Sequence, residues 1–114
     1  MPNQEARLDR LFKALADPTR RAVVARLCRG PAAVAELARH FDMALPSFLQ
    51  HLSVLKACEL IESQKSGRVR MVRLRPKALR QAESWIAQQR DQWERRRDQF
   101  DDYVKSLKPK DAES

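Results

Sequence analysis

Residues 45–76 read LPSFLQHLSVLKACELIESQKSGRVRMVRLRP and contain two different hydrophobic periods. In the first part, large apolar residues recur every three or four positions, which predicts a helix with one buried face. The positions expected to point inward are Leu45, Phe48, Leu52 and Leu55. The second part has two short runs, 60–64 and 69–74, around a connection that contains Gly67. This pattern predicts a β-hairpin directly after the helix.

Three shorter helices are predicted before this segment. Apolar residues repeat at i, i+3, i+4 and i+7 in the first (Leu8, Leu11, Phe12, Leu15) and in the third (Val34, Leu37, Ala38, Phe41). Asp17 and Pro18 suit the cap and first position of a second helix, at about 18–28. Residues 42–44 form a tight turn between the third and fourth helices. Two short helices joined by a tight turn form a helix-turn-helix, and a basic hairpin behind it is a wing.

A long helix is predicted at the C-terminal end. Pro76 ends the second strand, and residues 77–107 contain neither Pro nor Gly. The sequence thus predicts a mainly α fold with a small β-hairpin, a winged helix-turn-helix. We expect residues 1–107 to form a single domain, with 108–114 a frayed tail.

Size and composition exclude several classes of protein. The chain has 114 residues, 43% hydrophobic and 33% charged, which is typical of one soluble globular domain. No stretch approaches the roughly 20 apolar residues of a transmembrane helix, and the first residues do not form a secretory signal. We therefore expect a cytoplasmic protein that does not bind membranes. No catalytic arrangement or glycine-rich phosphate loop is present, so we expect neither an enzyme nor a cofactor.

Positive charge is the strongest feature of the composition. The chain carries 23 basic and 15 acidic residues, a net charge of +8. Residues 60–80 alone hold seven basic residues and one acidic residue, so much of the excess falls on the predicted hairpin. Such a distribution favours a polyanionic partner, and we expect double-stranded DNA.

Four segments together resemble the ArsR/SmtB family of bacterial winged-helix repressors. They are FKALADPTRRAVVARL (12–27), AELA (35–38), HLSVLKACELIES (51–63) and GRVRMVRL (67–74). The long helix, with AESWIAQQRDQWERRRDQFDDYV at 82–104, resembles one branch of that family. The resemblance implies a homodimer that represses transcription from palindromic operator DNA until an effector releases it.

The family's metal-binding motifs are missing from this chain. Metal-sensing members carry Cys-x-Cys-Asp/Glu-Leu on the third helix, where this chain has Ala33 and Ala35 before Glu36. Other members use Asp and His on the last helix, and residues 77–107 contain no His. Because metal sites need ligands of defined type and geometry, we expect no metal at either place.

Several residues are candidates for DNA contact. Ser47 and Gln50 are predicted on the outer face of the fourth helix, near its start, where a recognition helix meets bases or phosphates. A Gln side chain can pair with adenine, and a Ser hydroxyl with a base edge or a phosphate. The candidates on the wing are Lys65, Arg68 and Arg70.

Three further candidates have an alternative structural role. Thr19 and Arg20 begin the second helix, whose N–H groups could hold a phosphate, unless Asp17 simply caps that helix. His51 lies between the two faces of the fourth helix. It either donates to a phosphate or packs so as to orient the helix.

The aromatic residues of the long helix predict an obligate dimer. The long helix presents more apolar surface than one small domain can bury, on Trp85, Trp93 and Phe100. We expect them to pack across a two-fold axis, together with the apolar face of the first helix that holds Leu8, Leu11, Phe12 and Leu15.

Two other functions remain as alternatives. The protein could be a sensor gated by a small molecule or by thiol chemistry at Cys28 or Cys58. Winged domains also serve as protein-interaction modules without base readout, although a net charge of +6 on residues 60–80 argues against this.

Overall fold

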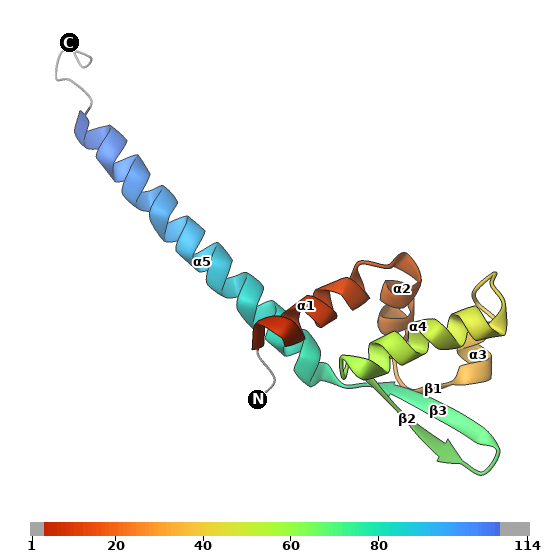
Figure 1. Ribbon diagram of the computed structural model, residues 1–114. Coiled ribbons are helices and arrows are strands. Elements are labelled where there is room, and N and C mark those ends of the chain that lie inside the picture. The colour runs from red at the N-terminus through yellow and green to blue at the C-terminus, as the bar shows by residue number, and fades with distance from the viewer. Residues whose placement is uncertain (1–3, 108–114) are drawn as a thin grey trace. The chain divides into compact units, whose positions relative to one another are not determined.

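The computed structural model describes residues 4–107, which form mostly helix with one small sheet (Figure 1). The helices are α1 (Gln4–Leu15), α2 (Pro18–Leu27), α3 (Val34–Ala38), α4 (Leu45–Ala57) and α5 (Pro76–Leu107). The strands are β1 (Ala32–Ala33), β2 (Ile61–Ser66) and β3 (Val69–Leu74). This is the predicted winged helix-turn-helix, with α3 and α4 as the two helices of the motif and β2–β3 as the wing.

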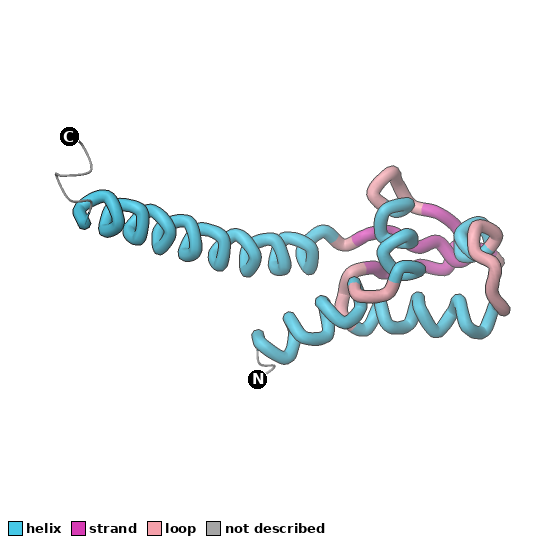
Figure 2. Tube along the Cα trace, turned by 90° about the horizontal axis from the view of Figure 1, so that it is seen from above, coloured by secondary structure: helices cyan, strands magenta, loops and turns pink. Residues whose placement is uncertain are grey.

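The sheet contains one strand that the sequence did not predict. β1 pairs antiparallel with β3, opposite β2, so the order is β1-β3-β2 (Figure 2). A strand of two residues is too short to show an alternating pattern in the sequence. Its pairing with Val72 and Met71 forms only in the folded chain. The third helix is also shorter than predicted, because α3 ends at Ala38 and Phe41 lies beyond it.

The chain divides into two compact units, residues 1–82 and 83–114. The first unit contains α1–α4, the sheet and the first turns of α5. Its core is wholly apolar among the described residues, and the largest fully buried side chains are Phe48, Leu37, Leu55, Leu60, Ile61, Val23 and Val72. These residues come from α2, α3, α4 and both wing strands, so the core holds the helix-turn-helix to the stem of the wing.

The described part of the second unit, residues 83–107, is a single uninterrupted helical segment. Its large apolar side chains are exposed, from Val104 at 39% to Phe100 at 64%. The frayed tail predicted at 108–114 lies outside the described residues. No helix within residues 4–107 is long and apolar enough to cross a membrane.

Candidate nucleic-acid interface

The start of α4 is positioned by the turn that precedes it. Ala44 has an extended backbone (φ −63°, ψ 144°), and Pro46 lies in the first turn, where its missing N–H costs nothing. The ring of Phe41, just beyond α3, stacks on that of Phe48 with centroids 5.2 Å apart. Phe48 is 1% exposed. This contact packs the turn between α3 and α4 against the first turn of α4.

One face of α4 is buried and the opposite face is open. Phe48, Leu52 and Leu55 lie in the core, whereas Ser47 and Gln50 are exposed as predicted. Neither of these two polar side chains forms a hydrogen bond within the described residues. Their donors and acceptors are therefore free to bind a ligand.

The prediction that Leu45 points into the core is wrong. Leu45 is 53% exposed, and Leu49, one turn further on, is 42% exposed. Leu45 is the first residue of α4, and the core packs only against the turns that follow it. Periodicity places a residue on a helix face but does not say how far along the helix the core extends.

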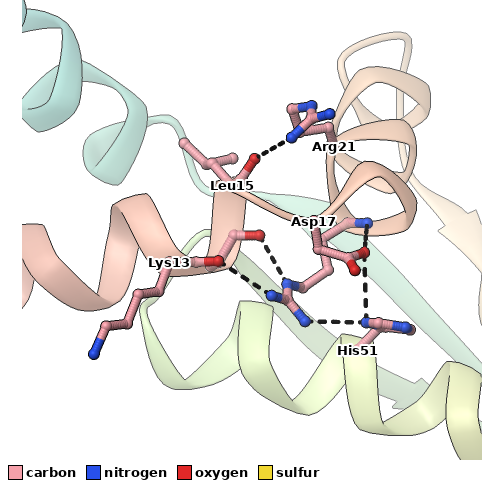
Figure 3. A network of polar contacts seen from close by, with 7 residues as sticks. Lys13, Leu15, Asp17, Arg21 and His51 are labelled. Atoms are coloured by element: carbon pink, nitrogen blue, oxygen red, sulfur yellow. Dashed lines mark hydrogen bonds and ion pairs between the residues drawn. The ribbon is translucent and has the colours of Figure 1, made fainter.

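Arg20 links α1, α2 and α4 through its guanidinium. Figure 3 shows the polar network around it, with Lys13, Asp17 and His51 labelled. Its Nε donates to the carbonyl of Ala14 (2.7 Å) and its Nη2 to that of Lys13 (3.1 Å), at the end of α1. Its Nη1 lies 3.1 Å from Nδ1 of His51, on α4. These contacts occupy all three nitrogens of the guanidinium, so Arg20 serves as an internal link.

Asp17 caps α2, which was the alternative to a phosphate site at Thr19 and Arg20. Its Oδ2 accepts the backbone N–H of Arg20 at 3.0 Å, and Pro18 begins the helix. This hydrogen bond, together with the charges of His51 and Arg20, lowers the pKa of Asp17 below its ordinary 3.8, against a smaller opposing effect of burial. A carboxylate therefore accepts one of the N–H groups that a phosphate at this helix start would use.

The same network fixes how His51 is presented. An arginine N–H can only donate, so in the contact with Arg20 the Nδ1 of His51 accepts and a ring proton is carried by Nε2. The same Nδ1 lies 3.7 Å from Oδ2 of Asp17. No half-buried or buried described residue has a solvent-inaccessible polar side-chain atom without a partner. Because Nε2 of His51 forms no hydrogen bond, it must be accessible to solvent. His51 thus orients the helix through one nitrogen and offers a donor with the other.

The wing carries a pair of like charges in direct opposition. In the register of β2 and β3, Lys65 faces Arg70, and Ser66 faces Val69. The two-residue turn between them has Gly67 at φ +63°, where a tight hairpin turn of type II′ places glycine, and then Arg68. Neither Lys65 nor Arg70 forms an ion pair within the described residues. Arg70 only donates to Ser63 Oγ at 3.2 Å.

The two basic residues nearer the stem of the wing share one carboxylate. Arg73 pairs with Glu62, which lies directly opposite on β2, and Arg75 lies 3.8 Å from the other oxygen of that carboxylate. Within the described hairpin, the basic residues that have no acidic partner are therefore those at its end, Lys65, Arg68 and Arg70.

The two cysteines differ in their surroundings. Cys28 is exposed at the end of α2. Cys58 is half-buried after α4, and its Sγ donates weakly to the carbonyl of Leu55 at 3.5 Å. Burial raises the pKa of the Cys58 thiol, which keeps it protonated and weakly nucleophilic. Within residues 4–107 no three His, Cys, Asp or Glu side chains gather as a metal site would require.

The two helices expected at a dimer interface differ in what they leave exposed. On α1, Leu11 is 3% exposed and belongs to the core, while Leu8, Phe12 and Leu15 are half-buried against it. On α5, Trp93 and Phe100 are 60% and 64% exposed. The guanidinium of Arg97 covers part of Trp93, 5.0 Å from the ring centroid. Tyr103, at 61%, is a further exposed aromatic residue that the sequence analysis passed over.

A helix-turn-helix with an open polar face and a basic wing defines the winged helix-turn-helix class of DNA-binding domains. The family model described as a helix-turn-helix domain matches residues 15–64. The chain belongs to the ArsR/SmtB family of transcriptional regulators, as the sequence resemblance indicated.

Three similar proteins support this assignment. An HTH-type transcriptional regulator of Mycobacterium tuberculosis is 48% identical over 71 residues, which are 62% of this chain and 66%, just under two thirds, of that protein. The transcriptional repressor SdpR of Bacillus subtilis is 32% identical over 79 residues, 69% of this chain and 88% of SdpR. The crystal structure of an ArsR family transcriptional regulator has a TM-score of 0.77 and 48% identity over 82% of this chain and 97% of its own. These relatives are named as regulators, not as enzymes.

Proposed function

We propose that this protein is a homodimeric transcriptional repressor that binds imperfectly palindromic operator DNA through α4 and the wing. The observation that carries the proposal is the cross-strand pair of Lys65 and Arg70. Like charges directly opposite each other destabilise a hairpin, and no acidic side chain among the described residues compensates them. A polyanion bound at the wing would relieve the repulsion between these two residues, and this relief would add to the free energy of binding.

Bases are proposed to be read by the open face of α4. The Gln50 amide has the donor and acceptor needed for the N7 and N6 positions of adenine in the major groove. Ser47, three residues earlier, serves a base edge or a phosphate. Both side chains are exposed and unengaged, which supports this role.

His51 is proposed to donate to a phosphate beside that groove. Its solvent-accessible Nε2–H is the group required, and its link to Arg20 holds the ring in place. Such contacts to the DNA backbone set the position of a recognition helix without reading sequence. Arg20 and Thr19 then contribute indirectly, through the positions of α2 and α4.

The aromatic surface of α5 is proposed as the main dimer contact. Exposed Trp93, Phe100 and Tyr103 are the residue types that form energetic centres of interfaces. The half-buried Leu8, Phe12 and Leu15 of α1 add to it, whereas Leu11 acts through the core. Residues 1–107 would then form one protomer of a symmetric dimer, which reads two half-sites about 34–36 Å apart. Repression as the outcome is supported by the similarity to SdpR, a transcriptional repressor.

Fluorescence anisotropy with DNA from upstream of the protein's own gene tests the proposal. The control is scrambled DNA of equal composition, and both are titrated at two salt concentrations. A specific autoregulator should prefer its own DNA by about 10³ or more. Equal and strongly salt-dependent binding to both fragments would contradict sequence-specific regulation at that site.

A further inference from the structure

Two exposed leucines border the open face of the recognition helix. Leu45 and Leu49 are four residues apart, so they lie one above the other on α4, at 53% and 42% exposed. Neither belongs to the core nor to the apolar residues packed against it. The first unit therefore leaves a small apolar strip beside the residues proposed to enter the major groove.

The position of Leu49 on the helix is specific. Successive residues of an α-helix are 100° apart, so Gln50 lies midway between Leu49 on one border of the open face and His51 on the other. His51 provides the donor Nε2–H on its border. Leu49 provides only methyl groups. The two borders of α4 thus differ in chemistry, one polar and one apolar.

An apolar side chain at the edge of a DNA-reading surface has one match in the major groove. Only thymine presents a methyl group there, at C5, and this is the group that an apolar side chain contacts when it reads a base edge. Leucine can neither bind a phosphate nor pair with a base edge. We propose that Leu49, extended by Leu45, contacts the C5-methyl group of a thymine within one or two base pairs of the adenine paired with Gln50. This inference rests on the proposed function, and it specifies one base of the DNA site that the protein would bind.

The surroundings of the strip favour DNA over a protein as its occupant. Two leucine side chains are far smaller than the area of 1,000 Å² or so that a specific protein interface buries. Gln50, whose polar group is open, directly follows Leu49, and Ser47 is exposed on the side of α4 away from the strip. The wing of the same unit carries uncompensated positive charge at Lys65 and Arg70. DNA is a polyanion with thymine methyl groups in its major groove, so it matches both the apolar strip and the basic wing.

The experiment uses deoxyuridine, which differs from thymidine only by lacking the C5-methyl group. The operator is first mapped by footprinting on the upstream fragment. Each thymine of a half-site is then replaced in turn, and anisotropy gives the Kd of each duplex. Loss of one buried methyl contact should weaken binding about fourfold per substituted half-site. We expect this loss at one or two thymines next to an adenine.

The Leu49→Ala variant tests whether the leucine carries the effect. It should bind the thymine duplex about as weakly as the full-length wild-type protein binds the deoxyuridine duplex, and it should no longer distinguish the two. Ser53→Ala, an exposed change on the same helix, should keep the wild-type discrimination. Leu49 is exposed, so the variant should fold, which a thermal melt verifies.

Each other outcome overturns the inference and has a separate meaning. If the protein prefers its own DNA but no deoxyuridine substitution matters, the methyl contact is absent and the proposed function stands. If Leu49→Ala remains methyl-sensitive, another residue reads the thymine. If Leu49→Ala instead changes the sedimentation of the free protein, the strip is a contact between two copies. If own and scrambled DNA bind equally, the proposed function and this contact fail together.

Discussion

The Nη1 of Arg20 lies 3.1 Å from the Nδ1 of His51, although 31 positions separate the two residues in the chain. Through the same guanidinium, α4 is linked to the last carbonyls of α1 (Figure 3). The orientation of the proposed recognition helix therefore depends on a side chain from α2. Arg20, a candidate phosphate ligand in the sequence, therefore belongs to the scaffold of the proposed DNA-reading surface.

Replacing Arg20 with Lys should separate these two roles. Lysine keeps the positive charge but has one nitrogen in place of three, so it cannot hold two carbonyls and His51 together. We expect a loss of about 1–3 kcal/mol in the free energy of unfolding, measured with urea. Arg29→Lys, on an exposed residue at the end of α2, should change little. Unaltered stability in Arg20→Lys would show that the link is dispensable.

The cap of α2 predicts a pH-dependent contribution to stability. The pKa of Asp17 is lowered in the folded protein, chiefly by the N–H of Arg20, so its charge stabilises the fold above the ordinary value of 3.8. That contribution is lost as the pH falls through the lowered pKa. Asp17→Asn keeps a capping oxygen but no charge, so it should be less stable than wild type at neutral pH. The difference in stability should shrink as the pH falls below 3.8 in urea titrations, because the charge of Asp17 is then lost. If the difference in stability between Asp17→Asn and the wild type does not change with pH, the charge of Asp17 is not its cause.

The end of the wing should determine much of the salt dependence of DNA binding. Arg68→Ala and Arg70→Ala should each reduce the slope of log K against log salt by about 1, because each lost phosphate contact releases fewer counterions. Arg73→Ala is the matched control, since Glu62 already neutralises that charge. Equal effects at Arg68, Arg70 and Arg73 would remove the distinction between the end and the stem of the wing.

Truncation of Trp93 should weaken the dimer. An exposed tryptophan that becomes buried between protomers typically costs about 2 kcal/mol or more when replaced by alanine, or ~30-fold in Kd. Analytical ultracentrifugation at nanomolar concentration measures the change in Trp93→Ala. Gln88→Ala, on another side of α5, serves as the control. A fully dimeric Trp93→Ala would place the interface elsewhere.

Local patterns were sufficient for most of the secondary structure. The helices at α1, α2 and α4, the hairpin and the long α5 follow from spacing, capping residues and breaks at Gly and Pro, which act within a few residues. The two-residue strand β1 was missed because its pairing with β3 spans about forty positions. The surface exposure of Ser47 and Gln50 was also predictable, since helical period alone turns them away from Phe48.

The sequence by itself determined the family, the order of elements and the charge on the wing, because these depend on residue types and on neighbours close along the chain. Only the tertiary structure decided which polar groups are already engaged. It joined Arg20 to His51 and Arg73 to Glu62, left Lys65 and Arg70 unpaired, and exposed Leu45 and Leu49. Whether a side chain is free for DNA depends on what the fold places beside it, and contacts between residues far apart in the chain leave no mark in local spacing.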